Sequence, residues 1–309
     1  MAARRDPTTD ALTLAAYRLG SSVAQWTPGP VAEATATAIG LSLSGVMRKR
    51  REMVERHLTR VNPNLRGVAL RRAVQAAFDS YARYYVESFR LPTLSNRVVA
   101  EGLEPRGYEE HLLPALSAGK GAIMAIPHLG GWEWAGRWVA DRGHRITVVV
   151  EPLDPPELFT WFADLRRDLG MNVVPLGPEA GAAVLSALRD NHIVCLLCDR
   201  DIHRTGIPVR FFGETTTLPA GPATLALRSG APILPTAIYF TQRVHGHLGV
   251  VRPPLPMERQ GRLREDVGRI TQLLAAELEV LIRRAPDQWH LQQPNWPSDP
   301  GYDDVVPGA

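Results

Sequence analysis

Short β-branched and apolar runs alternate with helical stretches from residue 122 to residue 284, and this alternation constrains the fold more than any other feature. The expected strands are AIMAI (122–126), ITVVV (146–150), NVVPL (172–176), IVCLL (193–197), APILPTAIY (231–239) and HLGVV (247–251). The expected helices are 132–141, 156–169, 179–189, 219–229 and 263–284. Strands that are separated by helices pair in parallel. The sequence therefore predicts an α/β fold, with a mostly parallel central sheet flanked by helices.

The residues before this region have helical spacing instead. Apolar residues recur at helical intervals in 10–25, 31–47 and 68–90. We therefore expect an N-terminal helical subdomain over 1–95 and an α/β domain over 96–309. The final segment, 286–309, is rich in Pro and Trp and is expected to lie over the surface.

Positive charge is concentrated near the N-terminus. The net charge is +3, yet residues 1–72 carry 12 Lys and Arg against 5 Asp and Glu, a net of +7, which leaves −4 for the rest. The apolar stretch 31–47 leads directly into Arg48, Lys49, Arg50 and Arg51. An apolar helix beside basic residues is typical of segments that lie on an anionic membrane. A helical pair packed on the body, with its charges in water, explains the same pattern, and both interpretations stay open.

Other features indicate where such a protein resides. Two cysteines, Cys195 and Cys198, are too few for a disulfide framework, which indicates a reducing compartment. Their C-x-x-C spacing lies in a predicted buried strand, so we expect unreactive core thiols. No apolar stretch reaches the ~18 residues of a spanning helix, and the first ten residues lack a signal-peptide pattern. We expect a peripheral protein on the cytoplasmic face of the membrane. The basic, aromatic-interleaved motifs of RNA-binding sheets are absent, so no nucleic-acid partner is expected.

A histidine and a glutamate follow the first predicted strand, in the run AIMAIPHLGGWEWAG (122–136). Reactive side chains of open α/β sheets collect at the carboxyl ends of strands. His128 has this position, and Glu133 opens the next helix. An imidazole that a carboxylate orients can remove a proton from an alcohol, and the helix start offers N–H groups to an oxyanion. The run indicates acyl transfer onto a hydroxyl, with a structural His–Glu capping pair as the alternative.

Three charged residues, Asp199, Arg200 and Asp201, directly follow the strand 193–197. Charges beside a buried strand are costly unless they are paired or used. A metal site is not expected, because no third carboxylate accompanies them. We expect this triplet to position His128 and to bind polar groups of the substrate.

Three further residues are candidates for binding substrate. Glu151 ends a predicted strand, which places it near the same sheet edge as His128. Arg166 and Arg210 could each bind a phosphate, because a guanidinium offers paired donors. Arg167 competes with Arg166 for this role. An ordinary solvated surface position explains these arginines as well, and this alternative stays open.

These features occur in one order, followed by the run FFGETTTLPAGPATLALRSGAPILP (211–235). Together they resemble the bacterial lysophospholipid acyltransferase superfamily, in its branch related to lipid A late acyltransferases, over about 95–295. The tail PDQWHLQQPNWPSD (286–299) is similar to that of the actinobacterial phosphatidylinositol mannoside acyltransferases. A chain without a predicted membrane anchor fits this subgroup.

The resemblance implies an acyl-CoA-dependent O-acyltransferase. The donor would be an acyl-CoA, with palmitoyl-CoA expected, and no cofactor is implied beyond this substrate. The acceptor would be a mannose hydroxyl of a phosphatidylinositol mannoside, at the inner face of an anionic membrane. No covalent enzyme intermediate is expected, because no Ser or Cys has a G-x-S-x-G elbow around it.

The resemblance also implies roles for single residues. His128 matches the catalytic base, and Glu133 matches the acidic member of a His-x4-Asp/Glu motif. Asp199 and Asp201 lie where the family has a second acidic element, and the sequence does not say which one aligns or which acid pairs with the histidine. Arg166, together with the Glu at 151, matches positions that line the donor or acceptor site.

Two alternative functions stay open at this point. The same chemistry could serve another acceptor, such as a lipid A-like glycolipid or a lysophospholipid. A non-catalytic lipid- or nucleotide-binding protein on this fold would bind ligand without releasing CoA.

Overall fold

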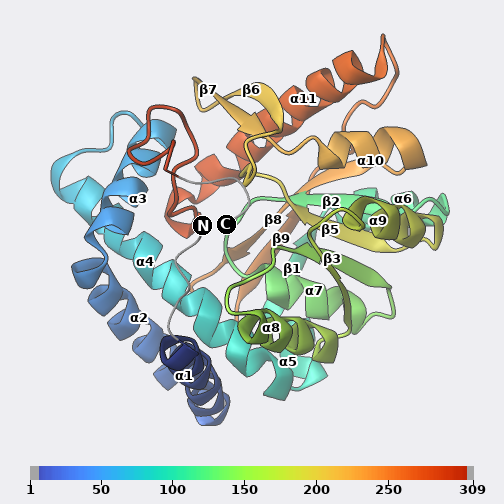
Figure 1. Ribbon diagram of the computed structural model, residues 1–309. Coiled ribbons are helices and arrows are strands. Elements are labelled where there is room, and N and C mark those ends of the chain that lie inside the picture. Colours follow the sequence, from blue (N-terminus) through green and yellow to red (C-terminus); the bar gives the residue numbers. More distant parts are fainter. Residues whose placement is uncertain (1–6, 305–309) are drawn as a thin grey trace.

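A seven-stranded sheet lies at the centre of the computed structural model, which describes residues 7–304 (Figure 1). Its strand order is β1-β9-β8-β2-β5-β3-β4. The strands are β1 (Leu103–Arg106), β2 (Ala122–Ile126), β3 (Ile146–Val150), β4 (Met171–Pro175), β5 (Ile193–Leu197), β8 (Ile233–Phe240) and β9 (His247–Val251). Neighbouring strands are parallel except for β8 and β9, which are antiparallel. The predicted α/β fold with a mostly parallel sheet is confirmed.

Helices cover both faces of this sheet. Those of the α/β part are α5 (Asn96–Gly102), α6 (Leu113–Ser117), α7 (Trp132–Ala140), α8 (Pro156–Asp168), α9 (Ala180–Arg189), α10 (Gly221–Ser229) and α11 (Leu263–Arg284). Alternate residues of β2 point to opposite faces, so Ile123 packs with α9, α10 and α11, whereas Met124 packs with α7. Each predicted strand and helix of residues 122–284 is present, with ends that agree within two residues.

Several elements escaped the sequence analysis. They are the helices Arg48–Val61, α5 and α6, strand β1, a π-helical turn at Tyr108–Leu112, the hairpin of β6 (Ile207–Phe211) and β7 (Glu214–Leu218), and the 3-10 turns Leu91–Thr93 and Pro286–Gln288. The hairpin strands IPVRF and ETTTL contain a proline and mostly polar residues, so their pattern is that of a loop. Phe211 and Leu218 of this hairpin are buried, and they join the core that α11 helps to form.

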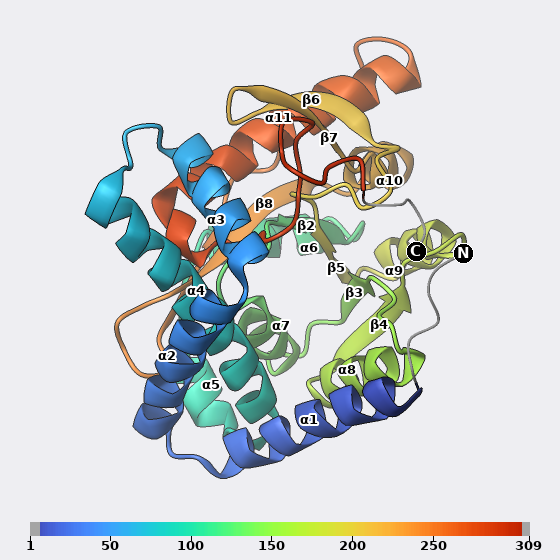
Figure 2. The same cartoon turned by 60° about the vertical axis from the view of Figure 1, so that its left-hand side comes forward.

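The N-terminal helices form a wall beside the sheet. They are α1 (Pro7–Trp26), α2 (Gly29–Val46), α3 (Arg48–Val61) and α4 (Gly67–Arg90). Helix α1 runs from the lower end of α4 toward α8 (Figure 2). Tyr17 on α1 contacts the rings of Phe89 on α4 and Phe162 on α8, so one aromatic cluster joins these three helices.

Helix α2 buries small residues and exposes large ones. Its buried residues recur every four positions and are Ala32, Ala36, Gly40 and Ser44. Val31, Leu41 and Val46 are 53%, 63% and 81% exposed. On α1, Trp26 is 89% exposed, and Leu12, Leu19 and Val23 are exposed with it. Exposed apolar side chains that gather on neighbouring helices are typical of surfaces that bind a membrane or another protein.

The expectation that the tail lies over the surface is wrong. Trp289, Leu291 and Trp296 are at most 3% exposed, and Trp296 is fully buried. The tail passes between the wall of N-terminal helices and the sheet, where its large rings fill the gap. His57 and Arg60 on α3 bind the carboxylate of Asp299, which closes the tail against that wall. Burying this aromatic surface favours the interior path.

Some expectations concern residues that the structure does not describe. The signal-peptide assessment of the first ten residues rests partly on 1–6, and the end of the tail is 305–309; both lie outside the described residues. Within 7–304, none of the helices combines the length and the hydropathy that are required to cross a bilayer.

We expect the close approach of α2 to α4 to depend on Gly40. A Cβ at this position would lie 2.4 Å from Asp79 Oδ1 and 2.7 Å from Asp79 Cα. Gly40→Ala should therefore lower the free energy of unfolding by about 1–3 kcal/mol, as overpacking does. Gly45→Ala on the same helix meets nothing within 4 Å, and it should be neutral or stabilising by up to ~1 kcal/mol. Urea unfolding measures both variants, and equal effects would contradict the packing argument.

Candidate active site

His128 and Asp199 meet at one edge of the sheet. His128 follows β2 and Asp199 follows β5, which are parallel neighbours, so the ends of the two strands bring these residues together. His128 Nδ1 lies 2.7 Å from Asp199 Oδ1, and the backbone N–H of His128 donates to Asp199 Oδ2 at 3.1 Å. The imidazole is 24% exposed and the carboxylate is fully buried. Asp199, and not Glu133, is thus the acidic partner of His128.

The electrostatics of this pair keep the carboxylate of Asp199 ionised. Burial raises the pKa of Asp199, but the charge of His128 and the hydrogen bonds from His128 and Trp289 outweigh it and hold this pKa below its usual range. An ionised carboxylate only accepts hydrogen bonds, so Nδ1 carries the ring proton. Nε2 is then the nitrogen that can take a proton from a substrate hydroxyl.

The tail completes the surroundings of the pair. Trp289 Nε1 donates to Asp199 Oδ2 at 2.7 Å, and Asn295 Nδ2 donates to the backbone carbonyl of Asp199 at 3.1 Å. The backbone N–H of His290 donates to the carbonyl of His128 at 2.7 Å. Our sequence reasoning missed these residues. The two tryptophans in a short tail were the available signal, because large aromatic side chains seldom stay in water.

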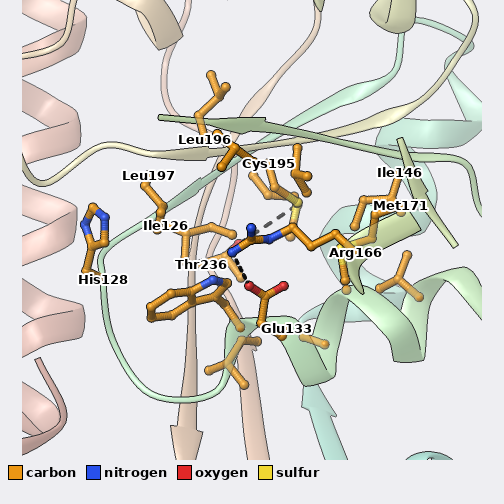
Figure 3. Close-up of a pocket in the computed structure, with 18 of the residues that line it drawn as sticks. Ile126, His128, Glu133, Ile146, Arg166, Met171, Cys195, Leu196, Leu197 and Thr236 are labelled. Atoms are coloured by element: carbon orange, nitrogen blue, oxygen red, sulfur yellow. Dashed lines mark hydrogen bonds and ion pairs between the residues drawn. The ribbon is translucent and has the colours of Figure 1, made fainter. Parts of the chain in front are cut away.

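Glu133 lies in the same cavity but has other partners. Its Oε1 accepts from Arg166 Nη2 at 2.5 Å and from the hydroxyl of Tyr84 at 3.1 Å. Burial lowers the pKa of Arg166, but the carboxylate of Glu133 and the oxygen of Tyr84 raise it overall. Figure 3 shows the Glu133–Arg166 pair beside apolar side chains of the cavity, with His128 to one side. The predicted orienting carboxylate therefore forms a separate ion pair, because α7 directs it toward α8.

Glu151 and Arg200 form a second ion pair at the edge that carries His128. Arg200 Nη2 donates to Glu151 Oε2 at 2.6 Å, and the two side chains are 18% and 39% exposed respectively. Both line the cavity together with His128. Because both groups are partly exposed at the edge of the cavity, their ion pair can open, and each can then bind a polar group of a ligand.

Asp201 and Arg210 do not join the site. Asp201 Oδ2 accepts from the backbone N–H of Gly206 at 2.7 Å and closes its own loop. Arg210 is exposed on β6, where its backbone N–H binds Gln272. Neither side chain lines the cavity. The loop after β5 turns Asp199 toward His128, whereas Asp201 faces the other way, which residue spacing alone does not reveal.

The cavity itself is apolar over most of its surface. It has a volume of about 490 Å³ and lies between one sheet face and α7. Its walls include Met124, Ile146, Met171, Trp138 and Ile238, and Figure 3 shows part of this lining. Cys195 is also part of the wall, and burial, with the charge of Glu133, raises the pKa of its thiol to about 12. This thiol stays protonated, in agreement with the expected unreactive core cysteine.

The first residues after His128 leave few backbone donors for an oxyanion. Leu129 N–H donates to Pro127 O at 2.7 Å, and Gly130 N–H donates to Gln288 O at 3.0 Å. These two amides between His128 and the helix start are therefore occupied. The start of α7, at residues 131–132, is the part that still fits this role.

A histidine on the tail should make stability depend on pH. His290 is 7% exposed, its Nε2 binds Ser80 Oγ at 2.9 Å, and its Nδ1 has no hydrogen-bond partner within the described residues. Burial, and then the charge of His128, lowers its pKa to about 3. In the unfolded chain a histidine has a pKa of about 6.5. Between these values the unfolded state binds the extra proton, so stability rises with pH.

We expect His290→Asn to flatten this dependence. Over pH 5–6, the slope of the unfolding free energy against pH should be smaller in the variant by up to about 1.4 kcal/mol per pH unit, which corresponds to one proton. Urea unfolding at a series of pH values measures both slopes. Parallel slopes would show that His290 takes up no proton on unfolding.

Sequence comparison with known proteins identifies the family of this chain. Residues 5–298 match the family of bacterial lipid A biosynthesis acyltransferases. A phosphatidylinositol mannoside acyltransferase of Mycobacterium tuberculosis is 43% identical over 228 residues, which are 72% of this chain and 70% of that protein. The protein of the same name from Mycolicibacterium smegmatis is 39% identical over 229 residues, which are 73% of this chain and 73% of that protein. The resemblance inferred from the motifs is confirmed.

Proposed function

We propose, because the chain belongs to the bacterial lipid A biosynthesis acyltransferase family, that it transfers a long-chain acyl group from acyl-CoA to a mannose hydroxyl of a phosphatidylinositol mannoside. The names of its relatives supply the acceptor. The observation that carries the proposal is the His128–Asp199 pair, which borders an apolar cavity of about 490 Å³. A general base beside an apolar cavity suits a long-chain thioester, and palmitoyl is the proposed acyl group.

In the proposed reaction His128 acts as the general base. Its Nε2 takes the proton from the sugar hydroxyl while that oxygen attacks the thioester carbonyl. Asp199 stabilises the resulting imidazolium through Nδ1. The tetrahedral intermediate collapses when the C–S bond breaks, and the imidazolium returns the proton to the sulfur of CoA. The products are an ester and free CoA, with no covalent enzyme intermediate and no resident cofactor.

The cavity gives each part of the substrates a fitting surface. The acyl chain occupies the apolar space between the sheet and α7, because transfer of its methylenes from water is favourable by about 0.8 kcal/mol each. Glu151 and Arg200 bind hydroxyl or phosphate groups of the substrates at the outer edge. Arg166 stays paired with Glu133 beside the cavity and compensates its charge.

The N-terminal helices bring this site to a membrane. The exposed apolar side chains of α1 and α2 insert among lipid chains, while Arg48, Lys49 and Arg50, which are exposed at the start of α3, contact anionic headgroups. The proposed location is the cytoplasmic face, where acyl-CoA is available. With α4, these helices make up most of the N-terminal helical subdomain, which we propose to be the part of the protein that faces the membrane.

We expect His128→Ala to abolish acyl transfer while the protein stays folded. Loss of a general base costs at least 10²–10⁴-fold in rate. Release of the CoA thiol from palmitoyl-CoA, in the presence of phosphatidylinositol mannoside, measures the reaction. His203→Ala is the matched control, because His203 is exposed and does not line the cavity. Full activity of the His128 variant would exclude the mechanism.

The same assay identifies the acceptor. Wild-type protein is incubated with palmitoyl-CoA and one of three acceptors: phosphatidylinositol mannoside, a lipid A precursor or a lysophospholipid. Thiol release with the mannoside alone supports the proposal, and release only with another acceptor replaces it. Binding of palmitoyl-CoA without release in any of these mixtures would indicate a non-catalytic lipid-binding protein.

We expect the triple variant Arg48→Gln, Lys49→Gln, Arg50→Gln to bind anionic liposomes about 100-fold more weakly, since each basic residue near the surface contributes about 1 kcal/mol. Vesicle co-sedimentation measures the affinity. A matched triple variant at Arg259, Arg262 and Arg264, which are exposed near the start of α11, removes equal charge at a distant site and should bind normally. Equal affinity of the two triple variants would contradict the proposed docking surface.

A further inference from the structure

We propose that Trp289 is a positioning residue for acyl transfer. Its indole N–H holds the carboxylate of Asp199 in the orientation that His128 requires. The inference rests on the proposed function, because the role of Asp199 is to support His128 as the base.

The hydrogen bonds of Asp199 divide between its two oxygens. Oδ1 binds His128 Nδ1 at 2.7 Å. Oδ2 accepts from Trp289 Nε1 at 2.7 Å and from the backbone N–H of His128 at 3.1 Å. The carboxylate is fully buried, so no solvent replaces a missing donor. Without the indole, Oδ2 keeps only the longer bond, and rotation about the Cβ–Cγ bond is less restricted.

The backbone of the tail places the indole with little freedom. Gly130 N–H donates to Gln288 O at 3.0 Å, and His290 N–H donates to His128 O at 2.7 Å. These bonds form a bridge between Leu129 and Trp289, so the residue after the base and the tryptophan are directly opposite each other. A displacement of the tail would therefore move the support of Asp199 and the backbone of His128 together.

A second set of contacts anchors the tail beyond Trp289. Asp299 Oδ2 accepts from the backbone N–H groups of Asn295 at 2.9 Å and Trp296 at 3.0 Å, and Asp299 Oδ1 accepts from Arg60 at 2.8 Å. Asn295 in turn donates to the backbone carbonyl of Asp199. Hydrogen bonds therefore connect α3, through Asp299 and Asn295, to the backbone of Asp199. Trp289, which precedes these residues in the tail, binds the carboxylate itself.

The groups that face Asp199 make the effect of the indole specific. His128 faces it from the loop after β2, His290 from the tail, and the neutral thiol of Cys198 from the end of β5. Trp289 is the neutral donor among the side chains that bind the carboxylate. Its removal shifts negative charge from Oδ2 toward Oδ1, which favours the protonated form of the imidazole. It also leaves the carboxylate less restrained.

The test compares Trp289→Phe with Trp296→Phe. Trp296 lies in the same tail, is fully buried, and donates its indole N–H to Phe211 O at 3.1 Å, but it does not touch Asp199. Both variants lose a buried indole hydrogen bond and similar volume. Trp289→Phe should lower kcat about tenfold or more with little change in KM for palmitoyl-CoA, because hydrogen bonds to charged groups are among the stronger ones. It should also move the acidic limb of the pH profile of kcat/KM to higher pH, whereas Trp296→Phe should do neither.

A double-mutant cycle separates positioning from a general loss of structure. Combined with Asp199→Asn, the substitution Trp289→Phe should cause no further loss of kcat, because its effect acts through the carboxylate. A merely structural role would give the same fractional loss in both backgrounds. Additive losses, or a Trp289 variant whose kcat and pH profile match those of the Trp296 variant, would overturn the proposal.

A spectroscopic measurement covers the case in which Trp289→Phe does not fold. In ¹⁵N-tryptophan-labelled protein, the indole proton of Trp289 should resonate downfield in the wild type and move upfield in Asp199→Asn, while that of Trp296 stays in place. An unchanged Trp289 signal would overturn the inference. If wild-type protein releases no CoA with any acceptor, the proposed function fails and this inference fails with it. An active wild type with an unaffected Trp289 variant overturns the inference alone.

Discussion

The buried carboxylate of Asp199 is the constraint on which the rest of the site depends. A charge without solvent must be compensated by hydrogen bonds or by an opposite charge, because its desolvation is otherwise prohibitive. Here the compensation comes from His128 and Trp289, which lie far apart in the sequence, and Asn295 binds the backbone carbonyl of the same residue. The end of β2, the end of β5 and the tail must therefore meet at one point. The path of the tail through the interior follows from this requirement as well as from its aromatic residues.

Most of the fold could be predicted from the sequence, because its strands and helices differ in periodicity. The runs from 122 to 251 are short and β-branched, and the segments between them have helical spacing. The exceptions have physical causes. The β6–β7 hairpin contains Pro208 and polar residues, and it is ordered by packing against α11 rather than by its own pattern. The tail has no regular periodicity, so its burial depends on contacts that only the folded protein makes.

The site could be predicted in part: the sequence identified the charged residues, but it did not show which of them pair with each other. His128 could be identified because a strand, a proline and two glycines define its position at a sheet edge. Its acidic partner could not, because the choice between Glu133 and Asp199 depends on which strands are neighbours. β5 lies directly beside β2, so Asp199 reaches the ring, whereas α7 directs Glu133 toward Arg166 on α8. Spacing along the chain does not contain the order of strands in the sheet.

The division between polar edge and apolar interior connects the chemistry to the membrane. Charged pairs of the cavity are neutralised locally, Glu133 by Arg166 and Glu151 by Arg200, so the remaining wall offers apolar surface to a hydrocarbon chain. Apolar surface is also exposed on the outside of the protein. Helix α2 buries its small residues Ala32, Ala36 and Gly40 and exposes the larger Val31 and Leu41. In water such a helix leaves large apolar side chains exposed, which is unfavourable. Contact with the proposed membrane surface would remove this penalty. The proposed membrane surface and the internal cavity are thus both apolar, and His128 lies at the polar edge of the cavity beside Glu151 and Arg200.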